Sequence, residues 1–127
     1  MKTSSAKAKG TRLEKEIARK LRDNDLDKDA KRMILSGASY LKGDIYTNLP
    51  ITIEAKNQEK WKLYEWYIQA VAENTASGKI PMVVCSRNRE DIYAFLSFDD
   101  LIFLMQLAKE GGWLPELKYS KRKAVGK

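Results

Sequence analysis

Two neighbouring segments decide how this chain folds: DIYT (residues 44–47) and, after a turn at NLP (48–50), ITIEAK (51–56). Apolar and polar residues alternate in ITIEAK, which is typical of a strand with one face on a core. The alternation puts Glu54 and Lys56 on one face and the isoleucines on the other. The two segments predict a hairpin that brings Asp44 level with Glu54.

Around this hairpin the hydrophobic periodicity predicts alternating helices and strands. We expect helices over about 12–24, 60–74 and 99–109, and strands over about 33–35, 44–47, 51–56, 80–86 and 92–96. The order αβββαββα predicts an α/β (α+β) domain with a mixed central β-sheet flanked by helices.

The spacing of polar and apolar residues also predicts how the three helices begin and which faces they bury. Thr11 and Glu14 form a capping-box pattern at the start of the first helix. The second helix is expected to carry one apolar face, formed by Trp61, Tyr64, Ile68 and Val71. The third is apolar around most of its circumference, which suits a subunit interface or burial in the core of one monomer.

Composition excludes several classes of protein. The 127 residues contain no histidine, which excludes Ser-His triads and His-based nuclease motifs, and a single cysteine, Cys85, which excludes a disulfide framework. Cys85 follows an apolar run and is expected to be buried and inert. No apolar run approaches the roughly 20 residues of a membrane span, so we expect a soluble, cytoplasmic protein.

Positive charge is concentrated at the two ends. The net charge is +7, yet residues 13–117 sum to about −2, because residues 1–12 carry four cations, 118–127 carry five, and neither segment has an acid. We expect basic flexible tails at 1–11 and 118–127 around one domain at 12–117. Two basic tails suit a polyanion such as nucleic acid, although solubilising ends are an alternative.

Asp44, Glu54 and Lys56 form the candidate chemical centre. Two converging carboxylates suit Mg²⁺, which prefers oxygen ligands and is usually held by one or two carboxylates plus substrate phosphate. Lys56 could orient a water or neutralise charge that develops on phosphate. The alternative is an ordinary solvated strand face, because an acid two residues before a lysine also occurs at 29–31 and 116–118.

The motifs, in order, are KGTRLEKEI (9–17), SGAS (36–39), Asp44, EAK (54–56), GKIP (78–81) and the strand segment 92–98. Over roughly residues 9–100 this series resembles the PD-(D/E)xK nuclease superfamily, and more narrowly the archaeal-type Holliday junction resolvases, which phages also carry. The resemblance implies a restriction-endonuclease-like nuclease core that uses Mg²⁺, with Mn²⁺ as a substitute, and no organic cofactor.

The resemblance also implies roles for individual residues. The implied catalytic residues are Glu14, Asp44, Glu54 and Lys56, and the implied metal ligands are Asp44, Glu54 and the backbone carbonyl of Ala55, with Glu14 as a further candidate. Implied DNA contacts are Lys9, Arg12, Lys15, Arg32, Ser39 and Gln69. Lys15 stands where the family often has an arginine, and Arg32 is the nearest match to another family arginine. For Glu14, a bond back to the helix start is the competing interpretation.

The function implied is paired nicking of four-way DNA junctions by a homodimer, since a two-fold junction requires two sites related by a two-fold axis. Two alternatives stay open: a phage nuclease for flaps, ends or duplex DNA, and a non-catalytic nucleic-acid-binding module. Trp61, Trp66 and Tyr67 are expected in the core or at a subunit contact rather than as base-stacking platforms.

Overall fold

The computed structural model describes residues 3–33 and 44–112, and within them three helices and five strands follow one another in the predicted order αβββαββα. The elements are α1 (Thr3–Asp23), β1 (Lys31–Arg32), β2 (Ile45–Tyr46), β3 (Ile51–Asn57), α2 (Leu63–Asn74), β4 (Ile80–Ser86), β5 (Tyr93–Phe95) and α3 (Phe98–Glu110). None of these helices is both long and apolar enough to cross a membrane.

The central sheet has the order β3-β4-β5 and is mixed, as predicted. Strands β3 and β4 run parallel, in register from Ile51 opposite Ile80 to Asn57 opposite Ser86. Strand β5 pairs antiparallel with β4. Parallel neighbours need a long crossover, and α2 supplies it by lying over one face of the sheet.

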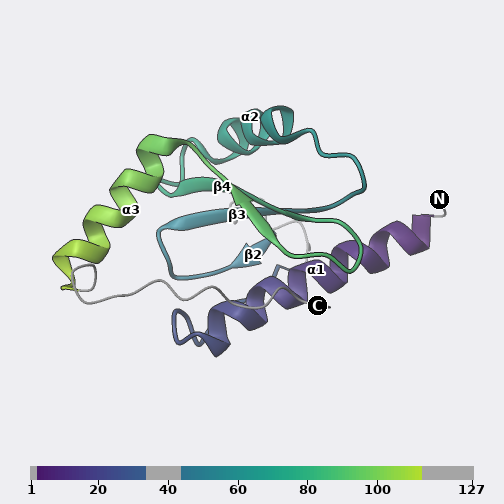
Figure 1. Ribbon diagram of the computed structural model, residues 1–127, viewed down its shortest axis with the longest axis horizontal. Helices are drawn as coiled ribbons and strands as arrows, with labels where there is room; N and C mark the ends of the chain where they lie inside the picture. The colour runs from purple at the N-terminus through teal and green to yellow at the C-terminus, as the bar shows by residue number, and fades with distance from the viewer. Residues whose placement is uncertain (1–2, 34–43, 113–127) are drawn as a thin grey trace.

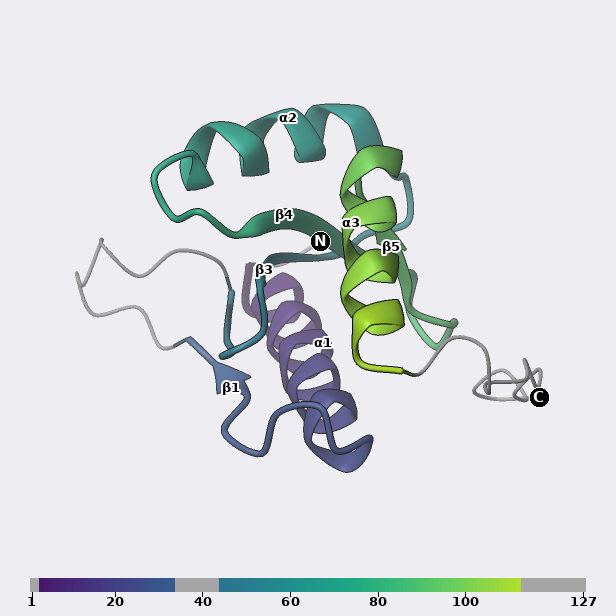
Figure 2. The ribbon, with the colours of Figure 1, turned by 90° about the vertical axis from the view of Figure 1, so that its left-hand side faces the viewer.

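Helices cover both faces of this sheet: α1 lies below it and α2 above it in Figure 1, and Figure 2 shows the same layers from the side. Leu13 and Ile17 of α1 pack with Ile51 and Ile53 of β3. On the other face, Trp66 and Ala70 of α2 pack with Val83 and Cys85. The Cys85 thiol is buried, as expected, and burial raises its pKa. Both faces of the sheet are therefore packed against helices, α1 on the side of β3 and α2 over β4.

The first helix is longer than expected. It begins at Thr3 rather than near residue 12, so residues 3–11, expected as a flexible tail, are helical. Thr11 lies inside the helix, and the capping-box interpretation was wrong. The reason is local: the segment 6–9 alternates alanine and lysine, both good helix formers, which outweighs one glycine at position 10. The second tail, 118–127, lies outside the described residues.

The predicted face of the second helix was also wrong. Tyr64 and Ile68 are 70% and 46% exposed, while Trp66, Ala70 and Asn74 are buried. Two stripes of α2 carry apolar side chains, and the spacing of three and four residues fits both. Packing against the sheet buries the stripe that contains Trp66. Gln69 and Glu73 lie next to this buried stripe.

The hairpin was predicted correctly in position but not in pairing. Strand β2 forms its ladder with β1, at residues 31–32 rather than the expected 33–35, of which 34 and 35 lie outside the described residues. Asp27 accepts hydrogen bonds from the Thr47 hydroxyl and the Asn48 backbone N–H, both at 2.7 Å. These bonds lower the pKa of Asp27 to about 2. Among the described residues, β2 belongs to a two-stranded sheet with β1, apart from the sheet that contains β3.

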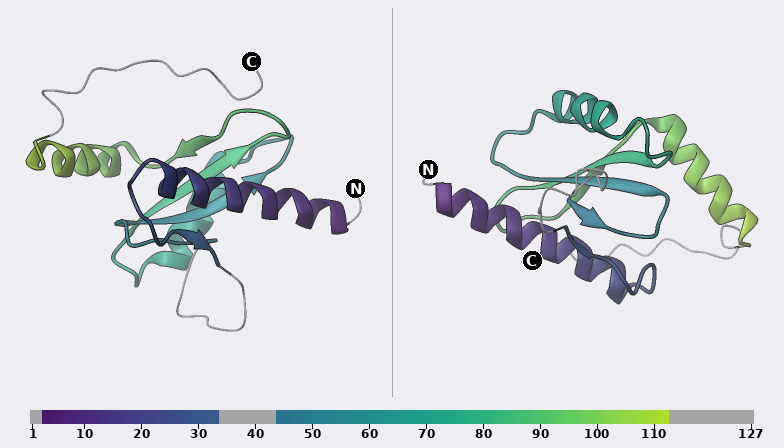
Figure 3. Two further views of the ribbon diagram at one scale, coloured as in Figure 1. Left: turned by 90° about the horizontal axis from the view of Figure 1, so that it is seen from below. Right: turned by 180° about the vertical axis from the view of Figure 1, so that it is seen from behind.

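Helix α3 extends from one end of the sheet, as Figure 3 shows from below and behind. Ser97 caps its first turn by accepting a hydrogen bond from the Asp100 N–H. No side chain of α3 is fully buried among the described residues, and Phe98 remains 70% exposed. The partly buried Leu104 packs against the core cluster of α1 and β3, so burial in the core of the same chain holds for one side of this apolar helix only.

Candidate functional site

The site begins with β3, whose two faces meet different helices. Ile53 and Ala55 point towards α1 and pack in its cluster. Glu54 and Lys56 alternate onto the other face, where their register partners on β4, Val83 and Cys85, pack under α2. Helix α2 packs on this face over β4, and Glu54 and Lys56 are only partly exposed, which distinguishes them from an ordinary solvated strand face.

Asp44 is held against the edge of β3 by two main-chain hydrogen bonds. Its N–H donates to the Ile53 carbonyl at 2.7 Å, and its Oδ2 accepts from the Ala55 N–H, also at 2.7 Å. The residue between these two contacts is Glu54. The structure thus brings the two carboxylates together, as the sequence predicted.

Glu54 is the most perturbed acid of the site. Partial burial, together with the nearby carboxylates of Asp44 and Glu73, raises its pKa to about 7, against a smaller lowering by Lys56. A raised pKa means that the charged form is destabilised. A bound cation would remove this penalty.

Glu73 is a residue of the site that the sequence analysis missed. It lies on α2, its charge acts on Glu54, and its Oε2 accepts a long hydrogen bond of 3.5 Å from the Gln69 amide. The missed signal is the spacing of Trp66, Ala70 and Asn74, which defines the buried stripe beside it. Gln69 thus contacts Glu73, and Glu73 in turn acts on Glu54 through its charge.

Glu14 faces Arg32 rather than the start of its own helix. Arg32 Nε donates to Glu14 Oε1 at 3.0 Å, and the two side chains are 32% and 18% exposed. Partial burial raises the pKa of Glu14, and Asp44 adds repulsion, while Arg32 opposes both. Glu14 therefore lies within electrostatic reach of Asp44, and Arg32 is engaged with an acid.

Lys56 extends over the buried ring of Trp66, with its Nζ 5.7 Å from the ring centroid. It also lines a cavity of about 510 Å³ with Asn57 and Lys9. Trp61 and Tyr67 make edge contacts with Tyr93 and Phe95. All three α2-side aromatics thus have packing partners, as expected.

The family model described as "Phage putative PDDEXK endonuclease" matches residues 5–120. The chain belongs to this endonuclease family. No curated protein and no solved structure matches the chain.

Membership in the phage endonuclease family confirms the coarser part of the resemblance, the PD-(D/E)xK superfamily, and makes DNA the substrate class. Nucleases of this superfamily typically use divalent metals. It also argues against the non-catalytic binding module. The narrower likeness to junction resolvases stays a prediction.

The oxygen ligands of the endonuclease site fit a hard cation that takes only a few of its ligands from the protein. Among residues 3–33 and 44–112, no three acidic, histidine or cysteine side chains gather closely enough to hold a metal on their own. Asp44 and Glu54 supply two carboxylates, and two are enough for Mg²⁺ when waters and substrate phosphate fill its other positions. In an extended strand the N–H and C=O of one residue point to the same edge. The Ala55 carbonyl therefore faces the edge where its N–H meets Asp44.

The remaining DNA-contact candidates are spread along α1. Lys9 lines the cavity beside Lys56, Arg12 lines a second hollow of about 480 Å³, and Lys15 is exposed. Ser39 lies outside the described residues. No DNA role of these residues is tested by the geometry, and they stay predictions.

Proposed function

We propose that this chain is a Mg²⁺-dependent endonuclease for branched DNA, with the four-way junction as its substrate. The observation that carries the proposal is the pair of hydrogen bonds that places Asp44 beside the partly buried Glu54 at the edge of β3. A partly buried acid with a raised pKa beside a second acid destabilises the metal-free protein, and such pairs are characteristic of functional sites.

Each residue has a distinct part in this proposal. Asp44, Glu54 and the Ala55 carbonyl hold the ion, while Glu14 adds a carboxylate nearby, kept in place by Arg32. A bound Mg²⁺ supplies Lewis-acid activation of the phosphate and of the attacking water. Lys56, whose ammonium lies over Trp66 and whose charge acts on Glu54, neutralises charge that develops on the phosphate or orients the water.

Cleavage assays test the proposed function directly. Labelled four-way junction, flap and linear duplex of one sequence are incubated with the chain in Mg²⁺, Mn²⁺ or EDTA. We expect metal-dependent paired nicks in the junction. Cleavage of flaps, ends or duplex in preference to the junction would favour the alternative phage nuclease, and no cleavage in either metal would contradict the endonuclease.

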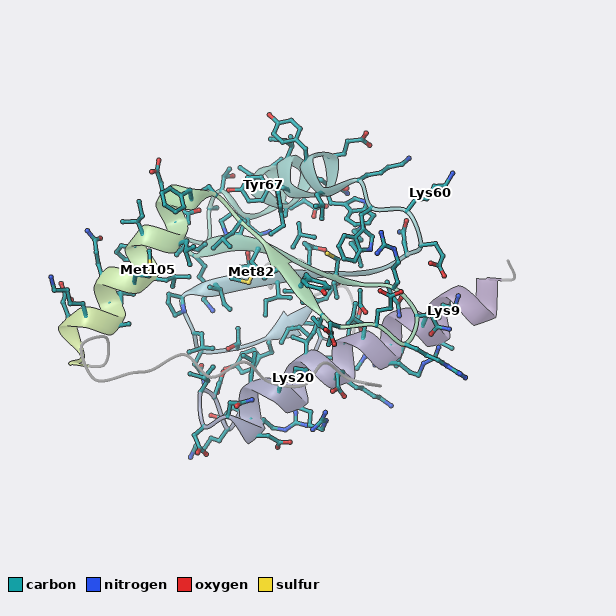
Figure 4. All side chains as sticks on the ribbon, in the orientation of Figure 1. Lys9, Lys20, Lys60, Tyr67, Met82 and Met105 are labelled. Carbon is teal, nitrogen blue, oxygen red and sulfur yellow. The ribbon has the colours of Figure 1, made fainter. Side chains whose placement is uncertain are left out.

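Lys56→Met should slow cleavage by about a hundred-fold, because it removes one charge aimed at the reacting phosphate. The methionine keeps an apolar stem over Trp66, so the fold should lose only about 1 kcal/mol from the cation–π contact. Single-turnover cleavage with enzyme in excess measures the rate. The matched control is Lys60→Met, an exposed lysine that Figure 4 shows beyond the end of β3. Equal loss in both variants would contradict a specific role for Lys56.

We propose in addition that α3 forms a homodimer interface, which would supply the two sites that paired nicking requires. Phe98, Leu101 and Met105 lie three and four residues apart on α3 and are all exposed. Leu101→Glu with Met105→Glu should convert a dimer into a monomer, as measured by sedimentation. Gln106→Glu, on the same helix, is the control and should leave the mass unchanged. A wild-type chain that is already monomeric would refute the interface.

A further inference from the structure

Two hollows beside the site adjoin each other at two shared residues. The first contains Lys56 and the second contains Arg12, and the two share Asn57 and Asn88. Their volumes are about 510 and 480 Å³. We call the combined feature the Asn57–Asn88 groove; it starts at Lys56 and ends at the loop of residues 87–90 between β4 and β5.

The groove is positively charged, although residues 13–117 as a whole are slightly acidic. Its lining holds five cations against three carboxylates, and one of those, Glu16, is already paired with Arg19. The cations are Lys9, Arg12, Lys56, Arg87 and Arg89. A polyanion is therefore the ligand that fits this lining.

The loop at the end of the groove is held in shape from within. The Ser86 hydroxyl lies 2.7 Å from the Arg87 carbonyl oxygen and 3.0 Å from that of Glu90. Arg87 donates from Nε to the Glu59 carbonyl at 2.9 Å and stacks on Trp61, 4.6 Å from the ring centroid. The loop therefore presents its arginines from a preorganised backbone.

Arg89 adopts a conformation that side-chain-bearing residues rarely take, with φ +63°. This backbone aims an exposed arginine from a tight turn, and such conformations cluster at binding sites.

We propose that the Asn57–Asn88 groove holds the phosphates of the DNA strand that continues from the scissile phosphate. Lys56 marks the cleavage end, and Arg12 and Arg89 bind phosphates further along that strand. The inference rests on the proposed function, because it takes the scissile phosphate to lie at Asp44 and Glu54. It assigns DNA contact to the loop 87–90, which the motifs do not reach.

The test is binding without cleavage, so that it stands apart from the test of the nuclease itself. In an Asp44→Asn background with EDTA, Arg12→Gln with Arg89→Asn removes two cations, and asparagine tolerates the left-handed backbone at 89. We expect the slope of log affinity against log salt to fall by about 1.4 to 1.8 units, as for two lost phosphate contacts.

The control removes two exposed lysines away from the groove, Lys20→Gln near the end of α1 and Lys28→Gln in the loop after it; Figure 4 shows Lys20 and Lys9 well apart along this helix. Its salt slope should stay at the parent value. An unchanged slope in the groove variant, or an equal fall in the control, would overturn the proposal.

A second measurement maps the strand path without removing any cation. Asn88→Cys, labelled with a photoreactive maleimide, should crosslink to nucleotides next to the cleavage position, because the native Cys85 thiol is buried and protected. Lys28→Cys serves as the control. Crosslinks scattered evenly along the DNA would refute the groove, whereas a chain that crosslinks as expected but never cuts would refute only the proposed function.

Discussion

Asp44→Asn is expected to abolish metal-dependent cleavage while DNA binding persists. Asparagine can still accept the Ala55 N–H through its side-chain oxygen, so the contact at 2.7 Å and the local fold are retained. What is lost is one of the two charges offered to the cation. Changes to groups that only support a metal ligand cost about 10 to 100-fold, so losing a ligand should exceed about a hundred-fold. Junction cleavage and junction affinity, measured on the same preparation, separate the two effects.

Asp25→Asn is the matched control for this change. Asp25 is exposed and has a positive φ of 60°, which asparagine accommodates as readily as aspartate. It should cleave at the rate of the unmodified chain. Cleavage by Asp44→Asn within a few-fold of that rate would remove Asp44 from the site.

Glu54→Gln is expected to abolish cleavage and, unusually for a change at an active site, to stabilise the metal-free protein at alkaline pH. Burial holds the pKa of Glu54 at about 7, against an ordinary value of 4.5. The neutral glutamine has no charge to desolvate. We expect the free energy of unfolding at pH 8 in EDTA to rise by about 1 to 2 kcal/mol, a figure reduced for the partial solvent contact of Glu54.

The sign of this effect depends on pH. Between the unfolded and folded pKa values, the folded state holds a proton that the unfolded state has lost. The unmodified chain therefore loses stability as pH rises from about 4.5 to about 7, and the loss is complete above that range. The gain from Glu54→Gln should be absent at pH 4 and full at pH 8.

Mg²⁺ should reverse the order of stability of the unmodified chain and Glu54→Gln. Mg²⁺ binds only deprotonated carboxylates, so it should stabilise the unmodified chain more as pH rises and the glutamine variant little. Thermal unfolding at pH 4, 6 and 8, with and without Mg²⁺, measures both effects. The control Glu59→Gln changes an exposed acid just beyond β3 and should show neither. Lower stability of Glu54→Gln at pH 8 in EDTA would contradict the buried, charge-repelled carboxylate.

Much of the architecture was readable from the chain alone. The alternation in residues 51–56 and the helical spacing in 12–24 depend on neighbours a few positions apart, so β3 and the body of α1 lie where expected. The turn at 48–50 returns the chain over a short distance, and this local geometry places Asp44 beside Glu54. Short-range patterns thus predicted the element order and the central pair of acids.

Errors arose where two local solutions were equally good. On α2 two stripes carry apolar residues, and only contact with Val83 and Cys85 of β4 selects the one with Trp66. At Glu14 a capping box and a place in the active site both fit the sequence, and the start of α1 at Thr3 excludes the first.

The sequence by itself determined the order of elements, the strand that carries Glu54 and Lys56, and the approach of Asp44, because each follows from backbone periodicity and one short turn. Only the tertiary structure decided that α2 covers this face, that Glu73 adds its charge, and that Arg32 pairs with Glu14 across 18 residues. The physical reason is that desolvation and Coulomb interactions depend on the distance in space between side chains. Those distances are set by helix-on-sheet packing, which no local pattern specifies.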